Sequence, residues 1–290
     1  MKSFFSVIFI SFFIYSFSQQ EKVLKIRNYR IAVLSDSVKE SSGLDFFGEK
    51  LYTFNDSGNT SELFEIDKNS GKILRILKTN LINKDWETLT NDGKNFYIGD
   101  FGNNAGTRKD LKIYKIPFKY DSLTTDSVKT ISFYFPEQQD FTSKNLSTDF
   151  DAEAMIFLNG KIHLFTKEWK SKSVTHYIVN PEIAEKQPAE KTETSKTGFA
   201  GTDAAYFDKK LYLVGYTKGA EVYLEIFDET ESGIFFSGRS VRYFIGTAFS
   251  IGQIEGIAVN EDGIYISGEA FHSPLGIRKQ SFYFIPKEEF

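Results

Sequence analysis

Five oxygen-bearing side chains recur along the chain, each two positions before an apolar residue of a predicted β-strand. They are Ser42, Glu87, Glu153, Asp203 and Glu255. A set of carboxylates and hydroxyls, with no thiol in the chain and no histidine at these positions, suits a hard cation, Ca²⁺ first and Mg²⁺ second. These residues are therefore candidate metal ligands, provided that the fold brings them together.

Two interpretations of this set stay open. Four carboxylates that converge on a narrow space repel one another, and without compensation some of them would have to protonate. A bound cation removes this repulsion. Alternatively, the same residues form a solvated acidic rim that gives the fold a region of negative potential and holds no ion.

The elements that must position these residues belong to a strand–turn–strand unit that occurs five times. Each copy has an apolar first strand, a turn, and a second strand with a ring residue, which is Tyr in four copies and His163 in the third. The copies are SSGLDFFGEKLYTFND (41–56), WETLTNDGKNFYIGD (86–100), AEAMIFLNGKIHLFTK (152–167), TDAAYFDKKLYLVGY (202–216) and IEGIAVNEDGIYISGE (254–269). A strand-rich repeat of about 50 residues predicts a β-propeller.

Two further strand candidates follow each copy except the last, where only QSFYFIP (280–286) remains before residue 290. The missing strand is available near the other end of the chain, as YRIAVL (29–34). One terminus that completes the blade begun by the other leaves no open edge. We therefore predict an all-β fold, a five-bladed β-propeller of four-stranded antiparallel blades whose ring is closed by an N-terminal strand.

The spacing between the apolar residues that follow the five candidate ligands supports five blades and not six. The spacings are 45, 66, 50 and 52 residues, and the excess in the long one is less than half a blade. We expect this excess to form a loop at 136–149. The first strand of each propeller blade lines the central channel, so that a strand beginning with Asp149, Asp151 and Glu153 would open on the channel rim.

A second group of polar residues lies where the second strands end or in the loops after them. These possible rim or substrate contacts are Asp56, Asp100, Asn103, Arg108, Lys167 and Glu269. Asn, Asp, Ser and Gly in NDSGNT (55–60) and GDFGNNAGTR (99–108) also serve tight turns, which is the alternative interpretation. His163 replaces a packing tyrosine, and His176 and His272 are expected to stand alone.

The composition limits the function further. The chain has 290 residues, a net charge of −4 and no cysteine, so that disulfides are excluded and no basic stripe is available for nucleic acid. Residues 1–18, MKSFFSVIFISFFIYSFS, have the pattern of a secretory signal peptide, with an N-terminal membrane anchor as the alternative. We expect a single propeller domain at 19–290, exported to the periplasm or medium, with no later membrane span.

The order of the five candidate ligands resembles the calcium-activated nucleotidases (apyrases), which are five-bladed propellers with Ca²⁺ in the central channel. Their ring runs Ser, Glu, Glu, Ser, Glu. The segments KDWETLTNDGKNFYIGDFG, TGFAGTDAAYF and QIEGIAV are similar to their blades. The resemblance implies that Ser42, Glu87, Glu153, Asp203 and Glu255 carry calcium. Asp203 stands where that family has Ser, and Lys167-Glu168-Trp169 stands where it has an arginine pair.

A looser resemblance, to gluconolactonase-type propellers, rests on acidic channel residues, but those proteins have six blades. Two functions are thus open. One is a non-catalytic module that binds a small molecule, glycan or protein beside its cation. The other is a metal-dependent hydrolase of phosphoanhydrides or esters, in which the ion polarises the scissile group. The scarcity of cationic residues near the predicted rim favours the binding module.

Overall fold

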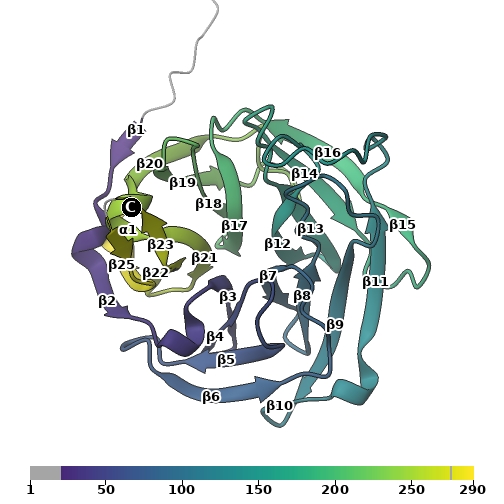
Figure 1. The fold of residues 1–290 in the computed structure, drawn as a ribbon, viewed down its shortest axis with the longest axis horizontal. Helices are drawn as coiled ribbons and strands as arrows, with labels where there is room; N and C mark the ends of the chain where they lie inside the picture. The colour runs from purple at the N-terminus through teal and green to yellow at the C-terminus, as the bar shows by residue number, and fades with distance from the viewer. Residues whose placement is uncertain (1–20, 275) are drawn as a thin grey trace, which may run out of the picture.

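The computed structural model describes residues 21–274 and 276–290, and the predicted signal peptide lies outside them. The described chain forms five blades in a closed ring around a central channel, as Figure 1 shows. This confirms the predicted all-β five-bladed propeller. None of the described helices is long and apolar enough to cross a membrane.

Each blade is built from four strands, and the first strand of each lies nearest the channel (Figure 1). The inner two strands of the five blades, in chain order, are β3 (Ser41–Phe47) and β4 (Lys50–Asn55), β7 (Trp86–Asn91) and β8 (Asn95–Asp100), β12 (Ala152–Leu158) and β13 (Lys161–Thr166), β17 (Ala200–Phe207) and β18 (Lys210–Tyr216), and β21 (Gln253–Val259) and β22 (Gly263–Glu269).

The outer strands complete the blades. They are β5 (Glu62–Ile66) and β6 (Ile73–Lys78), β9 (Lys112–Lys119) and β11 (Lys129–Tyr134), β14 (Val174–Val179) and β16 (Glu190–Ser195), β19 (Glu221–Asp228) and β20 (Ser240–Thr247), and β25 (Ser281–Pro286) and β2 (Arg30–Val33). Three short strands extend the sheets: β1 (Glu21–Val23) runs parallel to β20, β15 (Gln187–Pro188) runs parallel to β11, and β10 (Ser122–Leu123) pairs with β9.

The ring closes as the sequence predicts. Strand β2, which comes from the N-terminal part of the chain, pairs antiparallel with β25, so that Arg30 lies opposite Tyr283 and Val33 opposite Ser281. The long loop is also confirmed, because residues 136–149 contain neither strand nor helix. A short hairpin of β23 (Phe271–Ser273) and β24 (Gly276–Arg278) stands beside the one-turn helix α1 (Ala248–Ile251) in blade 5.

The apolar core lies between neighbouring blades. The ring residues of the second strands are buried there, and several contact an aromatic residue of the next blade. Tyr97 of blade 2 stacks on Phe157 of blade 3 at a centroid distance of 5.2 Å, and Tyr265 of blade 5 meets Phe46 of blade 1 edge-on at the same distance. Offset and edge-on aromatic pairs stabilise a core beyond their buried area. This packing fixes the five inner strands around the channel.

Candidate cation site at the channel mouth

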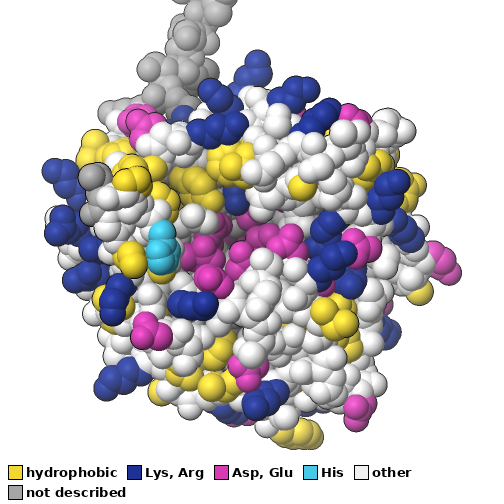
Figure 2. Space-filling view, viewed as in Figure 1, with side chains coloured by type: hydrophobic (Ala, Val, Ile, Leu, Met, Phe, Trp, Pro, Cys, Tyr) yellow, Lys and Arg dark blue, Asp and Glu magenta, His cyan; other side chains and the backbone are white. Residues whose placement is uncertain are grey.

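One end of the channel opens into a cavity of about 440 Å³ at the starting ends of the inner strands. Acidic side chains gather in this central hollow, as Figure 2 shows. The lining residues come from the first strands, from the ends of the second strands and the loops that follow them, and from the loop at 136–149: Ser42, Asp56, Glu87, Asn104, Asn145, Leu146, Glu153, Lys167, Trp169, Tyr216, Gln253 and Glu255. Four of the five predicted ring residues therefore meet at one cavity.

A β-bulge in each inner strand directs the glutamates toward this cavity. The pairing with the second strand skips Glu87, Glu153 and Glu255, which are the extra residues at these irregularities. A bulge leaves one residue outside the ladder and turns its side chain away from the regular alternation. The three bulged glutamates are consequently free to point along the channel axis and not into a blade.

The strand register corrects the fourth member of the predicted ring. The residues that pair with the ring positions of the second strands are Asp45, Thr90, Ile156, Ala205 and Ala258. Three positions before these stand Ser42, Glu87, Glu153, Thr202 and Glu255. Thr202, and not Asp203, is thus the register equivalent in blade 4. The sequence held a signal of this shift, because the interval from the apolar residue to the ring residue is 7 in blade 4 and 8 elsewhere.

Asp203 lies deeper in the channel and bridges three blades. Its Oδ1 accepts a hydrogen bond from Thr88 Oγ1 of blade 2 at 2.7 Å, and its Oδ2 accepts one from the backbone N–H of Ile257 in blade 5 at 2.8 Å. Burial raises the pKa of Asp203 well above its ordinary value, although these two hydrogen bonds oppose the rise. Both oxygens are occupied, so Asp203 holds blades together across the channel.

The two hydroxyl members of the corrected ring contact the following blade. Ser42 Oγ donates a hydrogen bond to the carbonyl oxygen of Glu87 at 2.6 Å, and Thr202 Oγ1 donates one to the carbonyl oxygen of Ile254 at 2.7 Å. Each hydroxyl hydrogen is thereby used. Ser42 lines the cavity and its oxygen can coordinate while the hydroxyl donates, whereas Thr202 is fully buried and does not line the cavity.

Lys167 places one ammonium group among the carboxylates. Its Nζ lies 3.2 Å from Glu153 Oε1 and stands over the rings of Trp169 and Tyr216 at 5.5 and 5.4 Å. Burial opposes the charge of Lys167, but Glu153 and Glu255 outweigh it and hold the pKa of the lysine well above its ordinary value. The ammonium is therefore a built-in counter-ion for one side of the cavity.

The carboxylates outnumber this single ammonium. Burial, and next the charge of Glu153, raises the pKa of Glu87 well above its ordinary value. Burial also raises the pKa of Asp56 to about 7 and that of Asp151 to about 6. Desolvation is the largest cause of each rise, and neighbouring negative charges add to it, because both penalise the ionised form. The negative charge of the carboxylates in and around this cavity is therefore not balanced by Lys167 alone.

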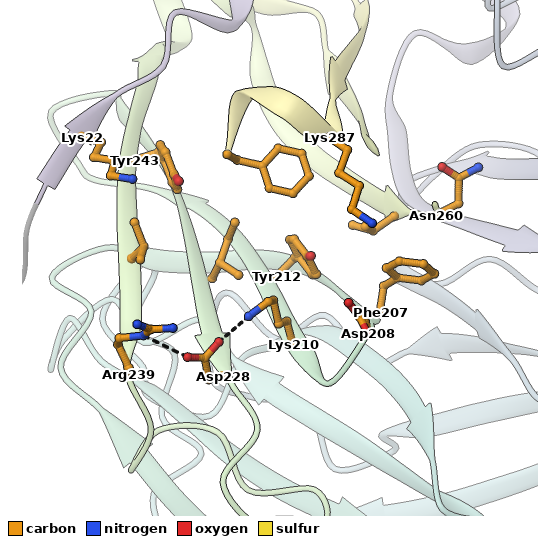
Figure 3. A pocket seen from close by; sticks show the side chains of 14 residues that line it. Lys22, Phe207, Asp208, Lys210, Tyr212, Asp228, Arg239, Tyr243, Asn260 and Lys287 are labelled. Atoms are coloured by element: carbon orange, nitrogen blue, oxygen red, sulfur yellow. Dashed lines mark hydrogen bonds and ion pairs between the residues drawn. The ribbon is translucent and has the colours of Figure 1, made fainter. Parts of the chain in front are cut away.

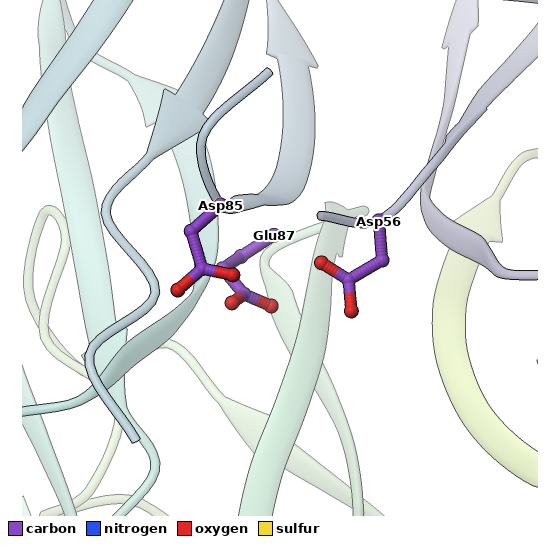
Figure 4. A group of neighbouring side chains, drawn as sticks. All are labelled: Asp56, Asp85 and Glu87. Carbon is purple, nitrogen blue, oxygen red and sulfur yellow. The ribbon is translucent and has the colours of Figure 1, made fainter. Parts of the chain in front are cut away.

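Asp85 is a site residue that the sequence analysis missed. Together with Asp56 and Glu87 it offers carboxylate oxygens that lie within 4.8 Å of one another. Figure 4 shows the three side chains grouped together. Asp85 precedes β7 in a loop. Its carbonyl oxygen accepts hydrogen bonds from the backbone N–H groups of Phe101 and Gly102, so that its position depends on the approach of the 101–108 loop. Gly102 permits that approach, since a Cβ there would lie 1.8 Å from Glu87 Oε1.

Three predicted rim contacts hold the 101–108 loop beside the cavity and do not line the cavity themselves. Arg108 forms an ion pair with buried Asp100 at 2.8 Å and donates to the carbonyl oxygen of Gly102 at 3.1 Å. The backbone N–H of Asn103 donates to Asp151 Oδ1 at 2.5 Å. Asp100, Asn103 and Arg108 therefore fix the loop that closes one side of the mouth. Asp56 and Lys167, by contrast, do line the cavity.

Glu269 lies next to the cavity and shares a partner with Glu255. Gln253 Nε2 donates to Glu255 Oε1 at 2.6 Å and to Glu269 Oε2 at 3.3 Å. Within residues 21–274 and 276–290, Glu255 Oε2, Glu269 Oε1 and Asp151 Oδ2 are buried without a hydrogen-bond partner. Buried acceptors without partners are costly. A cation in the cavity would offer such oxygens a partner, so the donor set fits a hard divalent ion.

The histidines depart from the expectation that His176 stands alone. His163 Nδ1 lies 2.8 Å from His176 Nε2, and His176 Nδ1 lies 3.2 Å from Glu193 Oε1. Glu193 in turn accepts from the backbone N–H groups of Phe235 and Phe236 in blade 4. This buried chain joins blades 3 and 4 away from the channel mouth, where it acts in packing, as expected for His163.

Comparisons with known proteins assign no family and no function to this chain. No protein-family model matches the chain, and no curated protein matches it significantly. Solved structures with a similar fold include a putative 6-phosphogluconolactonase from Bacteroides uniformis (12% identity, TM-score 0.37, covering 88% of this chain and 72% of that one). Others are the hydrazine synthase of Kuenenia stuttgartiensis (10%, 0.40, 88% and 68%) and a putative oxidoreductase (glucose dehydrogenase) from Thermus thermophilus (13%, 0.45, 87% and 85%).

Proposed function

We propose that this protein is an exported binding module whose channel mouth holds a divalent cation, Ca²⁺ first and Mg²⁺ second. The observation that carries the proposal is the convergence of Glu87, Glu153 and Glu255 from three blades on one cavity. Ser42 lines the same cavity, and Asp56 and Asp85 add carboxylates beside Glu87. Oxygen ligands of this number suit the six to eight contacts that Ca²⁺ takes.

The partner of the module is a small molecule, glycan or protein that completes the coordination of the ion from the open side of the mouth. The cationic groups argue for binding over hydrolysis of a phosphoanhydride. Among the described residues that line the mouth cavity, Lys167 is the one cationic side chain, and it is already paired with Glu153. Arg108 is held by Asp100 outside the cavity. A transferred phosphoryl group needs cations to stabilise its charge.

Calcium titration of the purified mature protein tests the cation site. Any ion that binds the folded state alone stabilises it, by about 2.7 kcal/mol when the ion stands at 100 times its Kd. We expect Ca²⁺ to raise the melting temperature above that in chelator, and elemental analysis to find one divalent ion per chain. Equal melting with Ca²⁺ and with chelator would overturn the proposal.

The variant Glu87→Gln removes one ligand charge while it keeps the shape of the side chain. We expect it to weaken Ca²⁺ binding at least tenfold in calorimetry, and to leave the fold intact in chelator because a repelling buried charge is lost. Glu49→Gln, on an exposed turn, is the matched control and should bind as the parent does. Calcium-dependent turnover of a nucleoside diphosphate, lost in Glu87→Gln, would establish the hydrolase instead.

Export is a separate part of the proposal. It rests on the signal-like pattern of residues 1–18. Expression of the full chain with its own leader should give a processed protein outside the cytoplasm that begins at Gln19. N-terminal sequencing measures this, and an unprocessed chain in the cytoplasmic fraction would contradict it.

A further inference from the structure

A second cavity lies between blades 4 and 5, at the end of the blades opposite the channel mouth. It has a volume of about 310 Å³, within the range of small-molecule sites. Val259, one of its lining residues, ends strand β21, whereas Glu255 stands near the start of the same strand. The apolar part of its wall consists of Phe207, Tyr212, Ile226, Val241, Tyr243, Val259 and Phe290.

One repeat position beside this cavity holds a small side chain. The positions equivalent to Val259, next to the residue that pairs with the ring residue, are Phe46, Asn91, Phe157, Tyr206 and Val259 in blades 1 to 5. Phe46 and Phe157 pack against the tyrosine of the preceding blade at 5.2 Å. Where blade 2 has Asn91, Phe96 fills the interface and lies 5.0 Å from Tyr52.

Tyr212 of blade 4 faces Val259 where other blades supply an aromatic ring. The described ring nearest to it is Phe290, whose centroid lies 6.2 Å away in an edge-on arrangement. A valine is smaller than a phenylalanine by most of a ring, and close-packed interiors do not fill such a difference by themselves. The cavity therefore has room for an aromatic ring beside Tyr212.

The rim of this cavity carries an excess of positive side chains. Lys22, Lys210, Arg239 and Lys287 stand around it, against Asp208 and Asp228. Figure 3 shows Lys210 and Arg239 paired with Asp228 on one edge, whereas Lys22 lies beside Tyr243 and Lys287 beside Asn260, on opposite sides of the cavity. Neither Lys22 nor Lys287 forms an ion pair with another residue of the described chain. Lys22 Nζ stands 5.4 Å from the centre of the Tyr243 ring.

We propose that this cavity binds a small aromatic carboxylate. The ring of the ligand takes the place of the aromatic residue that Val259 lacks and packs against Tyr212, and the carboxylate lies between Lys22 and Lys287. An aromatic ring in a preformed apolar pocket supplies most of the binding, and a few polar groups fix its orientation. The site is independent of the cation at the channel mouth, because it lies at the other end of the blades.

Binding of 3-phenylpropionate, followed by calorimetry and ligand-observed NMR, tests this site. We expect saturable binding of one molecule per chain, unchanged by chelator. Val259→Phe, which restores the repeat residue, should abolish binding while the protein stays folded with an equal or higher melting temperature. Val33→Phe makes the same substitution on exposed strand β2 and should bind as the parent does.

Charge reversal at the rim separates the roles of ring and carboxylate. The double variant Lys22→Glu/Lys287→Glu should weaken 3-phenylpropionate at least tenfold and leave the neutral 3-phenylpropionamide unchanged. Should Val259→Phe fail to fold, this pair of ligands decides the matter. Absence of saturation up to 5 mM, or equal binding by the parent and by a folded Val259→Phe, would overturn the proposal, whatever the outcome for calcium.

Discussion

Asp203 in the middle of the channel and Glu153 at its mouth are both buried carboxylates on inner strands, yet their surroundings differ. Asp203 accepts hydrogen bonds from Thr88 and from the backbone of Ile257, and both oxygens are occupied. Glu153 has one ammonium 3.2 Å away and several carboxylates around it. A buried carboxylate with fixed donors stabilises the fold, whereas carboxylates short of donors create a place for a cation.

The largest expected loss of stability comes from removing the hydrogen bonds of Asp203 in the middle of the channel. Asp203→Ala leaves the Thr88 hydroxyl and the Ile257 N–H buried without partners, and should lower the free energy of unfolding by about 2–5 kcal/mol. Asp56→Ala at the mouth should be neutral or stabilising in chelator, because it relieves repulsion. Urea denaturation of both variants measures the contrast. An equal loss in the two variants would show that the mouth and the mid-channel are alike.

A pH titration of stability compares both channel regions with the buried histidine chain of blade 3. Burial, and next the neighbouring His176, lowers the pKa of His163 from 6.5 to about 4. Between these values the unfolded chain binds the proton and the folded chain does not. The contribution of His163 to stability should therefore fall as the pH drops from 6.5 to 4, by up to about 1.4 kcal/mol per pH unit.

His163→Gln isolates this contribution. The mouth carboxylates, whose pKa values are raised, act in the opposite direction, since the folded state then holds protons that the unfolded state releases as the pH rises. The variant should lose the acid-side slope of His163 and keep the slope of the mouth, so that the difference between parent and variant gives the contribution of His163. An unchanged acid slope in the variant would assign the effect to other groups. Chemical denaturation at several pH values provides the data.

The smallest expected effect is a change in Ca²⁺ affinity when Lys167 at the channel mouth is replaced. Lys167→Met removes the built-in ammonium and keeps the apolar stem beside Trp169. Because the ammonium competes with a metal ion for Glu153, we expect Ca²⁺ affinity to rise about tenfold, which is about 1.4 kcal/mol. Stability in chelator should fall, since the carboxylates lose their counter-ion. A lower Ca²⁺ affinity, measured by calorimetry, would mean that Lys167 supports the ion and does not compete with it.

Much of the architecture could be predicted from the sequence because it is repeated. Five copies of an apolar strand, a turn and a ring-bearing strand predict the blades, and YRIAVL predicts the closing strand that pairs with β25. The same repetition brought Ser42, Glu87, Glu153 and Glu255 to one cavity in the prediction and in the structure. A periodic pattern averages over local irregularities, so it predicts elements better than individual side-chain directions.

The rest of the site could not be predicted, because it depends on contacts between segments far apart in the chain. Asp85 reaches Glu87 and Asp56 only because Gly102 lets a loop approach closely. Arg108 was expected near a ligand and instead pairs with Asp100, a partner that no spacing indicates. His176 meets His163 across two paired strands of one blade. Each outcome is decided by which partner lies nearest after the blades have packed.

For this protein, the sequence by itself determined the number of blades, the closing strand and the level at which acidic residues gather, because strand periodicity and repeat length are properties of the chain. The shorter interval in blade 4 signals the shift from Asp203 to Thr202, but the tertiary structure alone decided that Asp203 spans the channel. The physical reason is the β-bulge: one extra residue turns a side chain from the ladder toward the channel, and its position is set by pairing between strands.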